Sequence, residues 1–398
     1  MARVPVCGGP AFKQRRRLVM TAYINPAIIT WARERTSLTI EDLAYAMKKD
    51  PAEIRMWESG DKVPSYASLE ELAYQRLKIP LAVFFFPEKP NVPDPVNKFR
   101  RLPDTEFARL SPDTLHIMRI AQGYQDSLEQ LIGPASSRRK IFRDLTPKGK
   151  SPQQLASDTR KYLGITLEQQ FGFVGLEAAF KAWRFAVESA GVFTFKDTLK
   201  DRFISGFCLL HEYFPIIVVN NSNAFSRQVF TLAHELGHIL FGVDGITDAD
   251  ETYIEQMDDP EKALEIKCNQ YAAELLVPAV SFQQEMLAFN NQGLDIVPQL
   301  ADKYSVSREV ILRRLLDCDA ITKEYYTTKT TEWNADYSRP HGKGGGNWYL
   351  TRLSYLGEGF TNLAFDNFQQ GRLTKSELAR HLNVNARNID KLQSYLER

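Results

Sequence analysis

The sequence predicts an α+β fold that is mostly helical, with a small sheet in the middle of the chain. Two observations support this prediction. Helix-start signals recur at short intervals from residue 25 onward, while short β-rich runs bounded by polar residues occur between residues 191 and 220. At 398 residues the chain is long enough for two or three domains with well-filled cores.

The overall composition narrows the class of protein. Hydrophobic residues make up 43% and charged residues 25% of the chain, which is typical of globular proteins. The net charge of +1 provides no general attraction to nucleic acid or anionic membranes, and no segment has the roughly 18 consecutive apolar residues of a membrane span. Four scattered cysteines form no CxxC pair: Cys7, Cys208, Cys268 and Cys318. They suit a reducing compartment, so we expect a cytoplasmic protein without membrane contact.

Residues 1–19 carry several basic side chains but no apolar stretch, so they do not resemble a secretory signal. We expect a disordered basic extension, or an upstream start codon with Met20 as the natural beginning of the protein. A nucleic-acid-contacting arm is the alternative interpretation of this segment.

A helix-turn-helix bundle is predicted for residues 20–88, because three short helices begin there with capping signals. The N-caps are Asn25 ahead of Pro26, Thr39 with Asp42 as its reciprocal partner, and Asp50 ahead of Pro51. A tight turn at residues 48–50 joins the second and third helices, Gly60 can end the third, and another helix follows near residues 69–77.

Two roles stay open for this bundle, DNA contact and protein docking. Arg55 is the clearest candidate for reading bases, whereas Glu53 and Glu58 are unfavourable near phosphates. Three lysines are candidates for contacts to the DNA backbone: Lys48, Lys49 and Lys62.

Residues 89–150 are predicted to form a linker and a helical connector. The proline-rich segment 87–95 is typical of a stiff linker, and most of 104–190 has a helical pattern. The basic stretch 137–150 fits a loop or a solvated charged face better than a phosphate site.

The domain predicted for residues 151–330 contains the most informative pattern in the chain. His234-Glu235-Leu236-Gly237-His238 reads as HExxH. Residues i and i+4 lie on one face of a helix, so both imidazoles can reach one cation while Glu235 projects beside them. The apolar residues of the same helix form a separate stripe toward the core: Val229, Leu232, Leu236, Ile239 and Leu240.

Catalytic zinc requires three protein ligands and one open position, so a third ligand must come from elsewhere. Glu265 is the best candidate, because it lies on the buried stripe of a helix that begins at Asp259 and runs to about residue 277. Asn269, one turn further on, could orient a ligand from behind. A buried salt bridge is the alternative role for Glu265, and Glu274 is expected to face solvent. The acidic stretch 244–261 offers other carboxylates, but it fits a solvated loop better.

This arrangement indicates peptide hydrolysis, with Glu235 taking a proton from zinc-bound water and delivering it to the leaving amine. Tyr271 and His211 are weak candidates for stabilising the oxyanion. The β-rich runs 191–195, 203–210 and 214–220 predict a small sheet ahead of the motif, and the last run is a candidate edge strand for pairing with a peptide.

The C-terminal region, residues 331–398, is predicted to be helical. The glycine-rich run 341–346 lacks the context of a phosphate loop and fits a hinge or loop. The segment SELARHLNVNARNIDKL (376–392) has a helix-turn-helix pattern, for which simple packing is the more common explanation and DNA contact the alternative.

The two segments RQVFTLAHELGHIL and EIKCNQYAAELLVP together resemble the ImmA/IrrE family of bacterial metallopeptidases over roughly residues 150–330. The resemblance implies a zincin-like fold, His234, His238 and Glu265 as zinc ligands, and Glu235 as the catalytic glutamate. The stretch 24–65 resembles the Xre-type helix-turn-helix that precedes many such peptidases. The turn Met47-Lys48-Lys49-Asp50 departs from that pattern, which usually has glycine and then an apolar residue.

The resemblance implies a zinc endopeptidase that cleaves a regulatory protein, often a helix-turn-helix repressor encoded nearby, in phage, mobile-element or stress regulation. The alternative hypothesis is a DNA-binding regulator or antitoxin, whose peptidase fold holds a partner such as a small toxin without cleaving it. A homodimer is compatible with either hypothesis.

Overall fold

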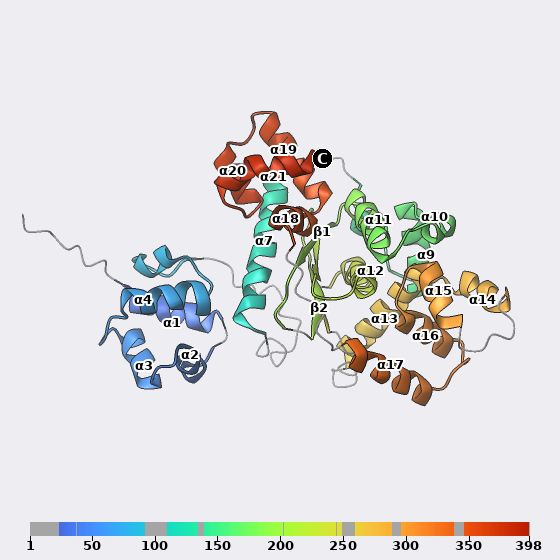
Figure 1. Ribbon diagram of the computed structural model, residues 1–398, viewed down its shortest axis with the longest axis horizontal. Coiled ribbons are helices and arrows are strands. Elements are labelled where there is room, and N and C mark those ends of the chain that lie inside the picture. The colour runs from blue at the N-terminus through green and yellow to red at the C-terminus, as the bar shows by residue number, and fades with distance from the viewer. Residues whose placement is uncertain are drawn as a thin grey trace, which may run out of the picture. The chain divides into compact units, whose positions relative to one another are not determined.

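The computed structural model describes residues 24–36, 38–91, 110–133, 139–201, 203–243, 245–248, 259–288, 296–337 and 346–397. Contacts divide the chain into two compact units, Met1–Val92 and Pro93–Arg398 (Figure 1). The predicted basic extension (1–19), residues 92–95 of the linker 87–95 and nearly all of the hinge 341–346 lie outside the described residues. Within the described part of the chain, no helix is long and apolar enough to cross a membrane.

Short helices make up the N-terminal unit, and the first three begin where the capping signals predict. They are α1 (Pro26–Glu34), α2 (Ile40–Met47), α3 (Pro51–Ser59), α4 (Tyr66–Glu70), η1 (Glu71–Arg76) and η2 (Leu81–Phe85). Asn25, Thr39 and Asp50 cap the first three helices, and Asp42 completes the predicted capping box of α2. Trp57 and Phe84 are among the largest buried side chains in the core of this unit.

The turn between α2 and α3 forms without glycine. Lys48 ends α2 in the left-handed region, with φ of 55°. A side chain in this conformation costs about 1–2 kcal/mol, which explains why glycine is common at such positions. Lysine therefore adopts this conformation at an energetic cost that glycine would avoid.

A four-stranded sheet lies at the centre of the second unit. Its strands are β1 (Phe193–Asp197), β2 (Ile204–Leu209), β3 (Ile216–Asn220) and β4 (Gly245–Asp248), in the order β1-β3-β2-β4. β1 and β3 are parallel, whereas β2 is antiparallel to both β3 and β4. The prediction that the run 214–220 forms an edge strand is wrong: β3 is paired on both sides, and β1 and β4 form the edges. β4 was not predicted.

The two faces of the sheet pack against different helices because the side chains of β3 alternate. Ile217 and Val219 join the core that contains α12 (Phe225–Phe241), while Ile216 and Val218 join the core that contains α7 (Pro112–Ile132). Figure 1 shows α7 on one side of the sheet and α12 on the other.

The remaining helices of the second unit agree with the mostly helical prediction. Ahead of the sheet lie α8 (Ile141–Asp144), α9 (Pro152–Leu163), α10 (Leu167–Phe171) and α11 (Leu176–Ser189). After β4 come α13 (Asp259–Leu276), α14 (Ala279–Ala288), α15 (Ile296–Tyr304), α16 (Arg308–Asp317) and α17 (Lys323–Tyr337). The last group is α18 (Trp348–Leu356), α19 (Glu358–Gln369), α20 (Lys375–His381), η5 (Ala386–Asn388) and α21 (Ile389–Leu396).

The C-terminal helices share a core with α7 and one face of the sheet. Buried Arg184 on α11 pairs with Glu188 and donates hydrogen bonds to the carbonyls of Ser354 and Tyr355 at the end of α18. The segment 376–392 contributes Leu378, Leu382 and Ile389 to the shared core, which supports the packing interpretation of its pattern. The predicted domain limits 89–150, 151–330 and 331–398 stay predictions.

Candidate metal centre

α12 carries the HExxH residues and is buried along most of its length. The predicted core stripe is confirmed, since Val229, Leu232, Leu236, Ile239 and Leu240 are all buried. The face that bears the two histidines is buried as well: His234 and His238 are 1% exposed, and Glu235 is fully buried. The motif therefore lies in the interior of the domain, where ionisable groups are costly without a partner.

Gly237 allows α13 to approach α12 closely. A Cβ atom at this position would lie 2.9 Å from Cδ1 of Tyr271 and 3.6 Å from Cα of Cys268, both on α13. The aromatic ring takes the space that a larger residue would fill. Glycine between Glu235 and His238 thus brings α13 near enough to supply a ligand.

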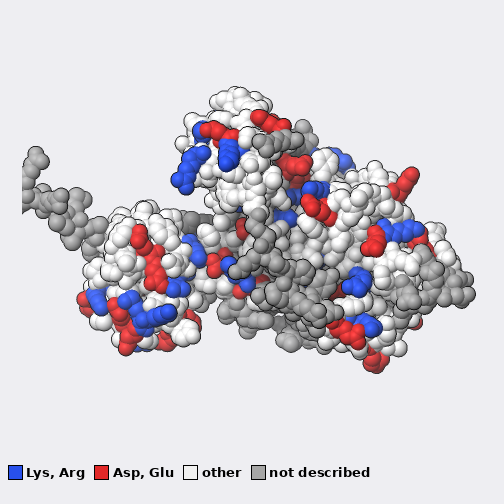
Figure 2. Space-filling view, viewed as in Figure 1, with Lys and Arg blue, Asp and Glu red and all other residues white. Residues whose placement is uncertain are grey.

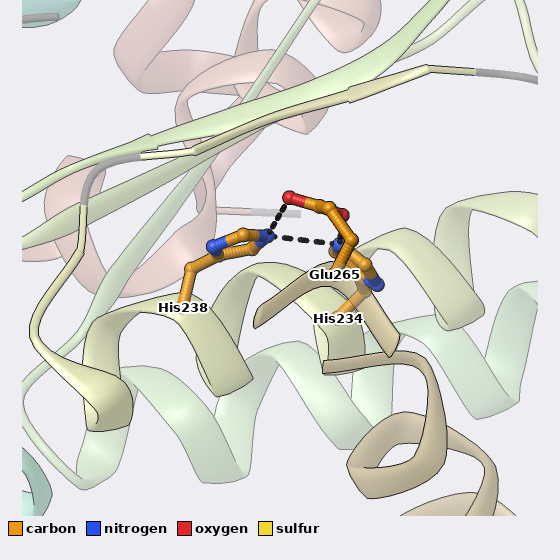
Figure 3. Close-up of side chains that lie close together, drawn as sticks. All are labelled: His234, His238 and Glu265. Atoms are coloured by element: carbon orange, nitrogen blue, oxygen red, sulfur yellow. Dashed lines mark hydrogen bonds and ion pairs between the residues drawn. The ribbon is translucent and has the colours of Figure 1, made fainter. Parts of the chain in front are cut away.

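Three predicted side chains meet where α12 and α13 cross (Figure 3). Nε2 of His234 lies 3.0 Å from Nε2 of His238. The Glu265 carboxylate places Oε2 3.2 Å from Nε2 of His234 and Oε1 3.1 Å from Nε2 of His238. All three side chains are buried, and their possible ligand atoms lie within 4.8 Å of one another.

The spacing of these atoms fits a small divalent cation. With bond lengths of 2.0–2.1 Å and tetrahedral angles, two ligand atoms on zinc lie about 3.3 Å apart. The observed separations of 3.0–3.2 Å are close to that value. Two imidazoles and one carboxylate are also the donor set of catalytic zinc sites that keep a fourth position for water.

Asn269 occupies the orienting position predicted for it. Its Oδ1 lies 2.9 Å from Nδ1 of His234. If Nδ1 donates its proton to this oxygen, Nε2 is left with a lone pair that faces Glu265 and His238. One turn of α13 therefore supplies both a candidate ligand and the group that fixes the tautomer of another.

The electrostatics show that the cluster accommodates positive charge. Burial opposes ionisation of Glu265, but the charge of His238 and the close approach of both imidazoles outweigh it and lower the carboxyl pKa well below its usual value. Burial also lowers the pKa of His238, but Cys268 and Glu265 raise it, and the net pKa lies well above the usual value for histidine. Both pKa shifts favour positive charge beside the Glu265 carboxylate, which is where a bound cation would contact all three ligand atoms.

The prediction for Glu274 is wrong. Its side chain is only 12% exposed and accepts a hydrogen bond from Arg314 on α16 at 2.5 Å. Arg314 also donates to the carbonyl of Val277. The periodicity of α13 placed Glu274 away from the metal face, but it could not show that another helix covers that side.

The two weak oxyanion candidates have structural roles. The fully buried Tyr271 hydroxyl donates to Oγ1 of Thr159 on α9 at 3.1 Å, and burial raises the pKa of this phenol. Nδ1 of His211 accepts hydrogen bonds from the backbone of Tyr213 and Phe214 in the turn between β2 and β3. The acidic stretch 244–261 lies mostly outside the described residues.

A polar network that the sequence did not reveal anchors the end of α13. Nη1 of Arg160 donates to Oε1 of Gln170 and to the carbonyl of Leu275, at 2.8 and 2.7 Å. Gln170 in turn donates to the carbonyls of Leu276 and Tyr304. Burial lowers the pKa of Arg160 to about 10. These bonds satisfy carbonyls at the end of the helix that carries Glu265.

The basic stretch 137–150 forms internal contacts where the structure describes it. The guanidinium of Arg139 stacks on Tyr162, Arg143 pairs with Glu212, and Lys150 pairs with Asp158. These contacts agree with a solvated charged face.

The four DNA-contact candidates lie in the N-terminal unit, and three of them have acidic partners. Arg55 lies 2.6 Å from Glu41, while Lys49 and Lys62 both contact Glu53, at 3.3 and 2.9 Å. Between residues 24 and 91 there are nine lysines and arginines against ten aspartates and glutamates. Figure 2 shows the two charge types interspersed over the described part of this unit on the face in view.

Comparisons with known proteins place the metal centre within a recognised domain. Residues 187–316 match the family model of the IrrE N-terminal-like domain, a peptidase family. The matched segment includes both histidines, Glu235 and Glu265. The chain is also 33% identical, over 104 residues, to the radiation response metalloprotease IrrE of Deinococcus radiodurans. That match covers 26% of this chain and 31% of the relative, so it spans about a third of the relative's length.

Proposed function

We propose that this protein is a zinc-dependent endopeptidase that cleaves a regulatory protein, such as a helix-turn-helix repressor, in the cytoplasm. One observation carries the proposal. A buried His234–His238–Glu265 cluster has the donor set and spacing for zinc, and the carboxylate of the HExxH motif lies on the same helix. The match to a peptidase domain over residues 187–316 supports the same chemistry.

Different residues are proposed to bind the metal and to transfer the proton during hydrolysis. His234, His238 and Glu265 would hold the zinc ion, with Asn269 orienting His234. Bound zinc supplies a Lewis acid that polarises the scissile carbonyl and lowers the pKa of water. Glu235 accepts the proton of the attacking water and passes it to the leaving amine.

The peptide substrate is proposed to bind along β4. This strand is an edge of the sheet and contacts α12, whereas the other edge strand, β1, contacts α11 and α18. An extended peptide can extend such an edge through main-chain hydrogen bonds. This assignment replaces β3 in the role that the sequence suggested.

The N-terminal unit is proposed to dock the protein partner rather than read DNA. Most of the basic side chains proposed to contact DNA are paired with glutamates. Large side chains are also exposed on the surface of this unit, among them Tyr45 on α2 and Met56 on α3. Aromatic and methionine side chains are enriched in protein interfaces. The unit would then deliver the regulatory protein to the metal centre.

Co-expression with the products of adjacent genes tests the proposal. Wild type should cleave one of them, and Glu235→Gln should retain zinc and fold but lose cleavage by at least about a hundredfold. Glu168→Gln, the same change at an exposed position on α10, serves as the control. Equal cleavage by Glu235→Gln would refute the role of Glu235. Binding of a partner by zinc-loaded wild type without cleavage would support the alternative, a regulator that only holds its partner.

A further inference from the structure

A pocket of about 290 Å³ opens beside the metal centre and has no assigned role in the proposed hydrolysis. Its walls come from the N-terminal end of α12, the middle of α13, the length of α16 and one side of α17. Three arginines line it: Arg227, Arg308 and Arg313. It is called the arginine pocket below.

Among the residues that line the arginine pocket, three arginines outnumber two carboxylates. Glu309 and Asp317 also line the pocket, and Asp317 lies 3.5 Å from Arg313. Arg308 is exposed, and it forms no ion pair with any residue that the structure describes. Its guanidinium lies over the ring of Trp333, 5.1 Å from the centroid. Arg308 donates no hydrogen bond to a residue that the structure describes, so its N–H groups are available to an acceptor.

The start of α12 adds hydrogen-bond donors to the same pocket. This 17-residue helix begins at Phe225, its N-cap residue Ala224 provides no side-chain hydrogen bond, and its first turn has no acidic residue. Ala224, Ser226 and Arg227 line the pocket. The first N–H groups of a helix lack partners within the helix and favour negative charge. Nδ2 of Asn223, another lining residue, is buried without a hydrogen bond to any described residue.

Two lining residues connect the pocket to the metal centre. Asn269 contacts Nδ1 of His234, and the ring of Phe230 lies 6.2 Å from the imidazole of His234. The pocket therefore begins one side chain away from a metal ligand. An extended peptide advances about 3.3 Å per residue, so a substrate side chain within about three positions of the scissile bond can reach it.

We infer that the arginine pocket receives an acidic side chain of the peptide substrate. Arginine binds carboxylates through two parallel N–H groups, and the aromatic walls formed by Phe230, Tyr326 and Trp333 reduce competition from water. The inference rests on the proposed function, because it names the class of substrate for the same centre. The pocket selects peptides with aspartate or glutamate close to the cleaved bond.

Cleavage of a peptide library by the zinc-loaded full-length protein tests this inference. Sequencing of the products by mass spectrometry should show enrichment of aspartate and glutamate at one position within about three residues of the cleaved bond. For a selected peptide, replacement of that glutamate by glutamine should reduce kcat/KM of wild type about tenfold or more. Arg308→Glu should abolish this difference between the glutamate and glutamine peptides. Lys161→Glu, the loss of an exposed cation on α9, is the control and should behave as wild type.

A binding measurement separates failure of the inference from failure of the proposed function. The Glu235→Gln protein should retain acidic library peptides over their glutamine counterparts, and adding Arg308→Glu or Arg227→Gln should remove this preference. Cleavage without acidic preference, or with a preference unchanged by Arg308→Glu, overturns the pocket and leaves the peptidase intact. If wild type cleaves no peptide but acidic peptides bind in a manner that depends on Arg308, the proposed peptidase function is overturned and the proposed role of the pocket is supported. Absence of both overturns both.

Discussion

Charged side chains in the N-terminal unit and at the metal centre are held in different ways. The pair between Arg55 on α3 and Glu41 on α2 lies at the surface, with both side chains more than half exposed. Where α12 crosses α13, His234, His238 and Glu265 are buried within a few ångströms of one another. Surface pairs are nearly neutral in free energy, whereas buried groups of this kind require compensation. Burial is therefore what makes the second cluster informative about function.

Removal of a metal ligand should have the largest effect. His234→Ala leaves two of three candidate ligands, so the zinc content of the purified protein should fall from about one per chain to near zero. Stabilisation by zinc should disappear as well, which amounts to about 4 kcal/mol when free zinc exceeds its Kd a thousandfold. Metal analysis and thermal unfolding with and without a chelator measure both effects. His211→Ala should keep the metal, and full occupancy in His234→Ala would refute the ligand role.

Two glutamate-to-glutamine changes compare a buried pair with an exposed one directly. Glu274 pairs with Arg314, and both side chains are at most 12% exposed, whereas Glu41 and Arg55 are each more than half exposed. Glu274→Gln leaves the buried guanidinium of Arg314 with only the more distant carboxylate of Asp317, at 3.8 Å, and should lower the free energy of unfolding by about 2–3 kcal/mol. Glu41→Gln should change it by less than about 0.5 kcal/mol. Urea unfolding of both variants checks the contrast, which equal effects would contradict.

Asn269→Ala tests whether the metal centre depends on its supporting hydrogen bond. Loss of the contact to Nδ1 frees the His234 ring to rotate and to change tautomer, so zinc affinity should fall about 10–100-fold while the fold persists. Competition with a chelating dye measures the change. Asn269→Asp, which keeps an acceptor at the same place, should restore most of the affinity; unchanged affinity in Asn269→Ala would mean that the contact does not position the ligand.

Features that depend on residues close together in the sequence could be predicted, whereas contacts between distant residues could not. Helix caps such as Thr39 with Asp42 act within four residues, and the spacing of His234 and His238 is set by one helical turn, so both are visible in the sequence. Glu265 could be chosen because a carboxylate on an apolar stripe is unusual. The partner of Glu274 lies 40 residues away on α16, and β4 depends on pairing with β2. Such long-range contacts leave no periodic pattern in the sequence, so they become visible only in the folded structure.

The smallest effect on stability is expected at Arg55, which belongs to the exposed charge pair of the N-terminal unit. Because Glu41 already neutralises this guanidinium and the unit has no excess of basic residues, Arg55→Ala should leave the unfolding free energy within about 0.5 kcal/mol of wild type. Binding to the DNA upstream of its own gene should be equally weak in both proteins. DNA binding measured across salt concentrations decides the matter, because each phosphate contact adds to the salt dependence. The opposite result would be tight, salt-sensitive DNA binding by wild type that Arg55→Ala weakens. It would show that the Arg55–Glu41 pair opens when DNA binds, and that pairing at the surface does not argue against a nucleic-acid role.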